Sequence, residues 1–409
     1  MSTSLSLSER PGITSPESSF SELPDVTPAQ LGTQPGPALP TRSAWVEIDL
    51  KQLQRNFQLI NGDKSADLQV IAVVKDDGYG HGSLPVAQAA LEQGSSFLAL
   101  STLEEAMTLR DQGVTCRLLL LGDRPESELP WCVAHELTCC LSENHSLEQL
   151  AALAARAGKR VPVHVKVNTG MNRYGVRWTE AAALAERIYR TKSLLLEGIL
   201  SHFAQSDEAD KSFANLQLSR FNEVLAELDK RGIQVPLRHL CNSGGFLDLP
   251  QARFDMVRLG VLPLGVFPSS VCRRIPGIQS VMSVKARIAA IQHLEPGDSV
   301  GYGMRYTAST PRRIAVLPLG YGDGFPRVRN QGSTLIHGQR APLVGGVAMD
   351  ALTVDITDIP AAQLWDVAVL MGRQGDQEIS VHEVAKLKGS VSYDVLTGWR
   401  ARLPRVYLA

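Results

Sequence analysis

The sequence lacks several features that would assign a chain to a class at once. Its six cysteines include no CxxC pair, and 409 residues are enough to bury a core without a disulfide framework. Its 41 Lys and Arg nearly balance its 42 Asp and Glu, so no net positive charge favours nucleic acid or anionic lipid as a partner. These absences predict free thiols, no metal site and a small-molecule partner.

Long hydrophobic runs are also missing. No stretch approaches the ~20 apolar residues that span a bilayer, and the opening MSTSLSLSERPG has no basic segment followed by an apolar one. We therefore expect a soluble, cytoplasmic protein without a membrane partner. Residues 1–42 are rich in Ser, Thr, Gly and Pro and poor in aromatic residues, a composition that predicts a disordered tail.

From Trp45 onward, short apolar runs alternate with amphipathic stretches. Residues 85–93, 103–111 and 213–231 repeat apolar side chains at helical spacing. Such alternation predicts parallel strands joined by helical crossovers, and eight repeats favour a TIM-type (β/α)8 barrel over an open sheet. The eight strand-like runs are 70–74, 97–100, 117–121, 137–141, 161–167, 196–200, 237–241 and 255–257.

The pattern changes after about residue 280. Strand-like runs then follow one another with few helical stretches between them, and Gly, Pro and Asp turn signals separate the runs. The sequence therefore predicts an α/β protein in which residues 43–280 form the barrel and residues 281–409 form a mostly antiparallel β domain. The later runs are 284–294, 313–319, 333–336, 348–356 and 367–371.

Polar residues follow several of the barrel runs, where such a barrel carries its active site. Lys75 ends the first run, and an apolar barrel mouth would lower the pKa of its amine, as a lysine that condenses with a carbonyl group requires. An ordinary surface lysine is the alternative. The turns at 242–245 and 258–261 could present N–H groups and a hydroxyl to a phosphate, although ordinary turns use the same residue types.

Several motifs, in this order, resemble those of the alanine racemase family. AVVK at 72–75, followed by YGHG at 79–82, resembles the family's lysine motif for pyridoxal 5'-phosphate (PLP). The resemblance extends from about Trp45 to the C-terminus. The other matching motifs are KVNTGMNRYG at 166–175, SHFA at 201–204, His239 with Asn242-Ser243, MVRLG at 256–260, GYG at 301–303, GYGDG at 320–324 and Met349-Asp350.

The resemblance implies a PLP-dependent isomerase that interconverts L- and D-alanine and supplies D-alanine for peptidoglycan. It also implies a homodimer whose two active sites are shared between the chains. Inversion needs a base on each side of a planar intermediate. Lys75 would bind the cofactor and act as one base, and Tyr302 of the partner subunit would act as the other.

The resemblance also implies roles for the remaining site residues. Arg258 would face the pyridine nitrogen, and because a guanidinium keeps its proton, that nitrogen would stay unprotonated, which disfavours transamination. Arg173 would hold the cofactor phenolate and the substrate carboxylate, with help from the Met349 backbone. The others are Lys166, which can be carbamylated in the family and would orient Arg173; His202 beside the ring; His239 and Tyr321 in support; and Tyr79, Ser243, Gly260 and Val261 at the phosphate.

The chain departs from the family pattern at three positions. Ala401 stands where a Tyr commonly narrows the pocket, Gly346 where an Arg is usual near the substrate entrance, and Asn168 where an Asp is frequent. Ala401 predicts a roomier site unless Trp399 fills the space, so a racemase of broader specificity is an alternative function. A non-catalytic PLP-binding protein would lack the second domain and Tyr302, and a PLP decarboxylase would usually have an acidic pyridine partner.

Overall fold

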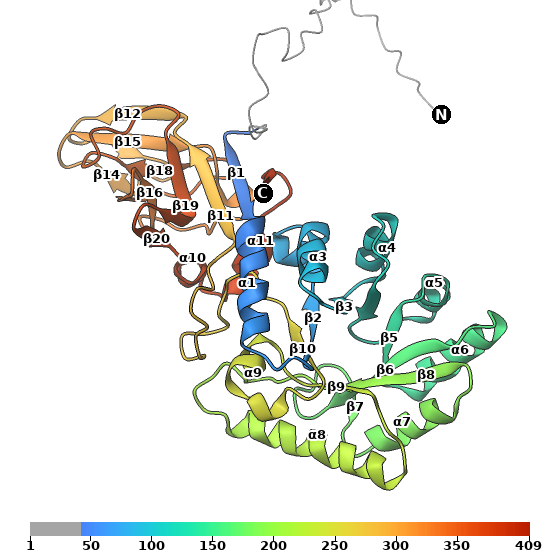
Figure 1. Cartoon of the computed structure of the whole chain (residues 1–409). Coiled ribbons are helices and arrows are strands. Elements are labelled where there is room, and N and C mark those ends of the chain that lie inside the picture. The colour runs from blue at the N-terminus through green and yellow to red at the C-terminus, as the bar shows by residue number, and fades with distance from the viewer. Residues whose placement is uncertain (1–41) are drawn as a thin grey trace, which may run out of the picture. The chain divides into compact units, whose positions relative to one another are not determined.

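The computed structural model describes residues 42–409, which belong to one compact unit. The expected disordered tail, residues 1–42, lies outside the described residues except for its last position. Parallel strands form an N-terminal barrel, and mostly antiparallel sheets form a C-terminal domain (Figure 1). The predicted fold class is therefore confirmed.

The barrel strands pair in the order β10-β2-β3-β4-β5-β6-β8-β9, and every ladder between them is parallel. The two ends of this series meet through single backbone bonds: Asp255 N–H donates to the carbonyl of Arg238, and Arg258 N–H to that of Cys241. The barrel is thus nearly closed. Its strands are β2 (Gln69–Val73), β3 (Phe97–Leu100), β4 (Arg117–Leu120), β5 (Thr138–Leu141), β6 (Val161–Asn168), β8 (Leu194–Leu200), β9 (Leu237–His239) and β10 (Met256–Leu259), and the short β7 (Val176–Arg177) adds to β6.

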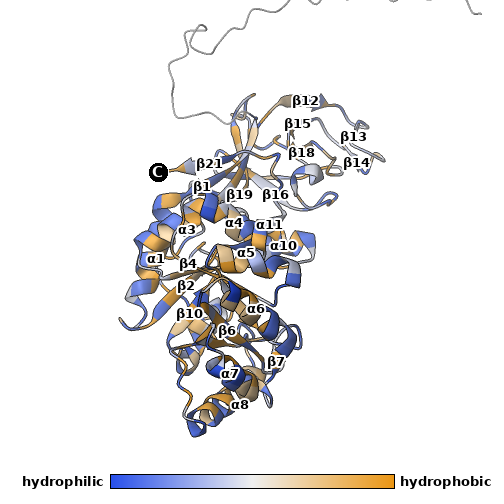
Figure 2. Cartoon of the chain, turned by 90° about the vertical axis from the view of Figure 1, so that its right-hand side faces the viewer, coloured by the Kyte–Doolittle hydropathy of each residue, from blue (hydrophilic) through white to orange (hydrophobic). Residues whose placement is uncertain are grey.

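Strands in such a barrel are largely buried on both faces, which explains why most of their residues are apolar. Helices follow most strands, and Figure 2 shows hydrophobic and hydrophilic residues on different sides of several of them. In α7 (Ala181–Arg190), the buried side chains include Leu184 and Ile188, which are four residues apart and so share one side. The other helices are α1 (Leu50–Gly62), α3 (Ser83–Glu92), α4 (Leu103–Asp111), α5 (Leu129–Ala134), α6 (Asn144–Arg156), α8 (Ser212–Lys230) and α9 (Ser243–Asp248).

The first described strand, β1 (Ala44–Asp49), does not join the barrel. It pairs antiparallel with β11 (Met282–Arg287) and parallel with β21 (Arg405–Leu408), in a sheet ordered β17-β16-β19-β11-β1-β21. Residues near both limits of the described chain therefore complete the β domain. The remaining strands are β12 (Ala290–Leu294), β13 (Ser299–Val300), β14 (Tyr306–Thr307), β15 (Arg312–Leu317), β16 (Ser333–Ile336), β17 (Gln339–Pro342), β18 (Leu352–Asp355), β19 (Val367–Gln374) and β20 (Gln377–Ile379).

Two helices near the C-terminus, α10 (Val381–Lys388) and α11 (Ser392–Gly398), were not predicted. Helix α11 packs against α2 (Lys75–Gly80), the turn that follows β2. The approach is close, since a Cβ on Gly80 would lie 2.5 Å from the carbonyl oxygen of Leu396. The guanidinium of Arg405 also donates to the carbonyl of Gly80 at 3.3 Å. The C-terminal segment thus holds the turn that begins with Lys75.

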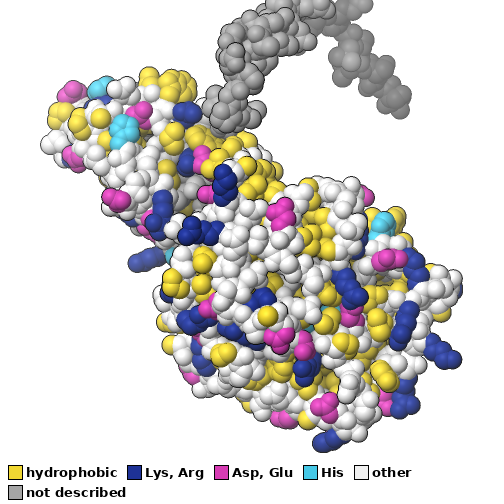
Figure 3. Space-filling model, in the orientation of Figure 1, with side chains coloured by type: hydrophobic (Ala, Val, Ile, Leu, Met, Phe, Trp, Pro, Cys, Tyr) yellow, Lys and Arg dark blue, Asp and Glu magenta, His cyan; other side chains and the backbone are white. Residues whose placement is uncertain are grey.

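Charge on the surface is mixed. Figure 3 shows basic and acidic side chains interspersed on the face that it draws, in agreement with the formal net charge of −1. Within residues 42–409, none of the helices combines the length and the hydrophobicity that a membrane crossing needs.

A capping box at the start of α4 gives a first testable prediction. The hydroxyl of Thr102 accepts a bond from Glu105 N–H at 3.2 Å, and the Glu105 carboxylate accepts one from Thr102 N–H at 3.1 Å. We expect Thr102→Ala to lower the free energy of unfolding by about 1 kcal/mol, measured by urea denaturation. Thr108→Ala, which removes an exposed hydroxyl inside the same helix, is the control and should change it by less than about 0.5 kcal/mol. Equal losses in the two variants would contradict the cap.

Candidate active site

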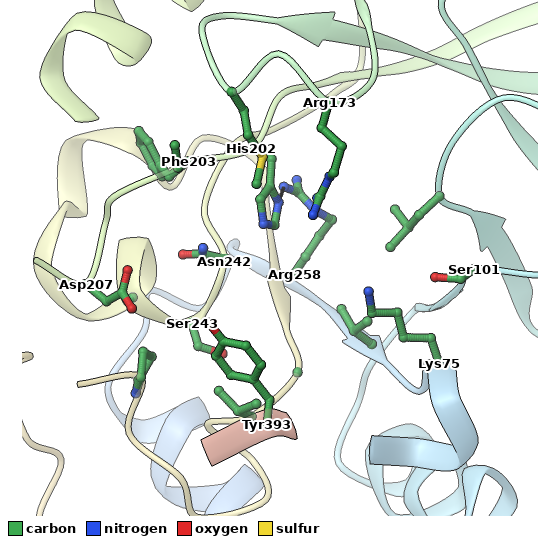
Figure 4. A pocket seen from close by; sticks show the side chains of 18 of the residues that line it. Lys75, Ser101, Arg173, His202, Phe203, Asp207, Asn242, Ser243, Arg258 and Tyr393 are labelled. Carbon is green, nitrogen blue, oxygen red and sulfur yellow. Dashed lines mark hydrogen bonds between the residues drawn. The ribbon is translucent and has the colours of Figure 1, made fainter. Parts of the chain in front are cut away.

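A cavity of about 440 Å³ opens at the C-terminal ends of the barrel strands. Figure 4 shows Lys75, Arg173 and Arg258 pointing into the same space from three different parts of the barrel. The structure thus brings together side chains that are far apart in the sequence. The predicted site residues that line this cavity are Lys75, Tyr79, Lys166, Arg173, His202, Ser243, Arg258, Gly260 and Val261.

Lys75 stands where β2 ends and a left-handed turn begins. Asp76, Asp77 and Tyr79 have φ angles of 53°, 52° and 53°, in a region that side chains rarely adopt. Asp76 N–H donates to the Glu105 carboxylate at 2.6 Å, which ties the turn to the start of α4. Burial, and then the charge of Arg173, lower the pKa of the Lys75 amine. A lysine of this kind is neutral more often near pH 7 than one in water, and the neutral amine is the form that acts as a nucleophile or accepts a proton.

Arg258 is buried on β10 and lies at the back of the cavity. Its two terminal nitrogens donate to His239 Nδ1 at 2.9 Å and to His202 Nδ1 at 3.1 Å, and also to the carbonyls of Ser201, His239 and Leu240. Burial lowers the pKa of Arg258 to about 10, so it remains a cation at neutral pH. Its Nε–H has no hydrogen-bond acceptor among residues 42–409, which leaves one donor for an acceptor atom of a ligand.

The opposite end of the cavity carries groups that can donate hydrogen bonds to an anion. Ser243 and Gly244 begin α9, whose N-cap Asn242 accepts a bond from Gly245 N–H at 2.9 Å. A Cβ on Gly260 would lie 2.6 Å from the Tyr79 hydroxyl, so a glycine lets that hydroxyl approach the backbone. Burial, followed by the charge of Asp76, raises the pKa of Tyr79 to about 12, so its phenol stays a neutral donor. Hydroxyls and N–H groups at a helix start are typical phosphate ligands.

Lys166 lines the same cavity on β6. Burial, followed by the charge of Arg258, lowers the pKa of its amine to about 7. The next turn carries Arg173, and its shape depends on Asn168, whose side-chain oxygen accepts bonds from Gly170 N–H and Asn172 N–H at 3.0 and 3.1 Å. Asn168, which stands where an Asp is frequent in the family, therefore still stabilises the loop that carries Arg173.

The β-domain residues predicted for the site do not reach this cavity. Tyr302 and Tyr321 line a separate pocket of about 260 Å³, together with Gly346 and Arg329. Tyr302 is 82% exposed and Met349 is 51% exposed. A single chain therefore does not bring Tyr302 and Lys75 together.

Sequence reasoning missed Tyr393, which lies on α11 and lines the cavity. It instead assigned the pocket to Ala401, but Ala401 is exposed in a turn away from the lining, and Trp399 packs against Phe325 with ring centroids 6.4 Å apart. Within a single chain, Tyr393 therefore lines the cavity (Figure 4) and Ala401 does not, and the expected breadth of substrates stays a prediction. The available signal was the apolar pair Val395-Leu396, which follows Tyr393 by two and three residues and is buried.

Comparisons with known proteins agree with this architecture. Residues 48–268 match the family model "Alanine racemase, N-terminal domain", and residues 281–407 match "Alanine racemase, C-terminal domain". An alanine racemase of Syntrophobacter fumaroxidans is 39% identical over 354 residues, which cover 86% of this chain and 94% of that protein. A solved alanine racemase of Clostridium difficile 630 has a TM-score of 0.85 at 29% identity, covering 91% and 96%. A solved histidine racemase of Leuconostoc mesenteroides subsp. sake has a TM-score of 0.82 at 26% identity, covering 91% and 100%.

The lowered pKa of Lys166 predicts a pH-dependent stability. Between its folded pKa of about 7 and the ordinary value of 10.5, the unfolded chain binds more protons than the folded chain, so stability rises with pH across that window. Lys166→Met removes this contribution. In urea denaturation between pH 7.5 and 9.5, we expect its stability to rise less steeply with pH than that of the unmodified chain, by up to about 1.4 kcal/mol per pH unit. Replacing the exposed Lys192 by Met should leave the slope unchanged, and equal slopes in all three proteins would exclude a buried amine at position 166.

Proposed function

Because the chain belongs to the alanine racemase family and is therefore an amino-acid racemase, we propose that it interconverts L- and D-alanine with PLP bound in the barrel cavity. The observation that carries this proposal is the convergence of Lys75, Arg173 and Arg258 on one cavity. The enzyme would work in the cytoplasm and supply D-alanine for peptidoglycan, as the family resemblance implies.

The cavity residues fit PLP at both of its ends. Arg258 has an uncommitted Nε–H that would donate to the pyridine nitrogen, and Lys75 has a pKa lowered by burial, as bonding to an aldehyde requires. At the other end, Tyr79, Ser243 and the backbone at Gly260 and Val261 would hold the phosphate. When bound, PLP supplies an electron sink that makes the Cα proton of an amino acid easier to remove.

Inversion at Cα needs proton transfer on two opposite sides. Lys75 would hold or release the proton on one side. On the other side we propose Tyr302 of the partner subunit, because Tyr302 of the same chain lies in a different pocket and is 82% exposed. The functional form would then be a homodimer in which each cavity is completed by the other chain, with Tyr321 in support.

Binding of the substrate would rest on charge. Arg173 reaches into the cavity from the loop after β6 and would hold the substrate carboxylate, together with the backbone of Met349 of the partner subunit. His202 would lie beside the cofactor ring, and His239 supports Arg258 directly. The pKa of about 7 at Lys166 leaves part of its amine neutral, the form that reacts with carbon dioxide, and a carbamate there would attract Arg173.

A racemase of broader specificity is the second candidate, since a solved protein of similar fold is a histidine racemase. The feature that favours alanine is Tyr393, whose ring forms part of the cavity wall and so reduces the room for a larger side chain. The residues that set side-chain tolerance should therefore be sought on α11 and not at Ala401.

The first functional prediction concerns Lys75. Lys75→Ala should lower alanine racemisation by at least about 10³-fold, because both an attachment point and a base are lost. Chiral chromatography of the purified holoprotein measures this loss. After borohydride reduction of the unmodified chain, peptide mass analysis should find the cofactor on residue 75. Lys64→Ala, at a lysine outside the cavity lining, is the control and should retain full activity. A reduced cofactor on any other lysine would overturn the assignment.

The second prediction concerns substrate size. Tyr393→Ala should raise kcat/KM for methionine relative to that for alanine by about tenfold, because it removes a ring from the cavity wall. Ala401→Tyr is the matched control and should leave this ratio within about twofold, since residue 401 lies outside the lining. A narrowed specificity in Ala401→Tyr would show that residue 401 borders the substrate after all.

A further inference from the structure

A continuous series of hydrogen bonds crosses the barrel interior behind Arg258. Arg258 donates to His239 at 2.9 Å, His239 Nε2 lies 2.8 Å from His164 Nδ1, and His164 Nε2 lies 3.2 Å from the Glu197 carboxylate. These residues stand on β10, β9, β6 and β8. All four are buried, with exposed fractions of 5% or less. The proposed reaction uses only the first two of them.

Local packing makes room for this series. A Cβ on Gly198 would lie 2.6 Å from the His164 ring, so the glycine beside Glu197 is what admits the imidazole. The His164 and His239 rings meet edge to face with centroids 5.0 Å apart. At the far end, Arg117 pairs with Glu197 from the surface, with 56% of its own side chain exposed.

The two ends of the series determine the direction of every bond. A guanidinium can only donate, so Nδ1 of His239 must accept and its proton must be on Nε2. His239 then donates to His164 Nδ1, and His164 donates from Nε2 to the carboxylate of Glu197, which can only accept when ionised. Burial lowers the pKa of His239 well below its usual value and that of His164 to about 3, so each ring is neutral and carries one N–H.

A neutral imidazole without a fixed partner can move its proton to the other nitrogen. If His239 carried its proton on Nδ1, two donors would face each other between His239 and Arg258. The guanidinium would then have to turn, and its Nε–H would no longer be held toward the cavity. The ionised carboxylate at the end of the series excludes this arrangement, because it requires a donor from His164 and hence from His239.

We infer that Glu197 and His164 are positioning residues for the racemase, which act through His239 to hold Arg258 with its Nε–H directed at the cofactor nitrogen. This inference rests on the proposed function. It extends the set of residues that serve the site from the cavity to a buried carboxylate on β8, which is separated from β10 by β9 alone. Neither residue touches the substrate or the cofactor.

The consequence concerns the fate of the Cα proton. With Arg258 held firmly, the cofactor nitrogen keeps no proton and the proton returns to Cα, so that alanine of either hand leaves. With Arg258 loosened, the proton taken from Cα could instead be delivered to the cofactor; one water molecule would then hydrolyse the bond between substrate and cofactor, release pyruvate and leave the amino group on the cofactor. Loss of Glu197 should therefore change the ratio of the two outcomes.

The test compares Glu197→Gln and His164→Gln with Glu47→Gln, a matched control that removes the partner of Lys285 in the β domain. In holoenzyme with L-alanine, we expect both barrel variants to lower kcat at least tenfold with KM within twofold. Pyruvate formed per racemisation should rise at least tenfold. Glu47→Gln should leave all three quantities unchanged. Unchanged pyruvate ratios in folded Glu197→Gln and His164→Gln would overturn the inference.

A second readout does not depend on activity. Nitrogen NMR of histidine-labelled protein, recorded with and without PLP, reports which ring nitrogen carries the proton. We expect His164 and His239 to carry it on Nε2 in the unmodified chain, and His239 to lose this single form in Glu197→Gln. A proton on Nδ1 of His239 in the unmodified chain would refute the inference alone, whereas a correct tautomer without any racemisation would refute the proposed function and leave the tautomer assignment in place.

Discussion

The interaction on which the rest of this structure depends is the burial of one guanidinium. Arg258 cannot discard its proton at neutral pH, and an unpaired cation inside a barrel would be very costly, so its N–H groups must find acceptors. Three carbonyls and two imidazoles supply them. These acceptors come from the ends of β8 and β9 and from His202, and His239 is itself hydrogen-bonded through His164 to Glu197. Its remaining donor, Nε–H, belongs to a side chain that lines the cavity.

The barrel could be predicted because its evidence is local. Most strands are short, largely apolar and buried, and the positions of all eight agree with the structure to within a few residues. The C-terminal helix α11 could not be predicted in this way, since it is only seven residues long and is stabilised by packing on α2, more than 300 residues earlier in the chain. Because α11 was not predicted, position 401 was taken as the one where a tyrosine would narrow the pocket, whereas Tyr393 lines it.

The residues of the candidate site also divide into those that local sequence reveals and those that depend on distant contacts. Lys75 and Arg258 could be found because polar residues at the ends of apolar runs stand out, and motif resemblance supplied their expected roles. Glu197 and His164 lie inside such runs, where a polar residue gives no sign of its partner. Their partners are 33 and 75 residues away and are brought close only by the neighbouring barrel strands. Contacts of this kind become visible only when the fold is known.

The contacts between the C-terminal segment and the turn after Lys75 affect the order in which the parts of the enzyme can form during synthesis. The barrel strands can pair as the chain emerges from the ribosome, because their order in space largely follows their order in sequence. The turn gains its contacts with Leu396 and Arg405 only after those residues have also emerged. A nascent chain that has made its whole barrel therefore still lacks the contacts of its C-terminal segment with this turn, and the surroundings of Lys75 are completed last.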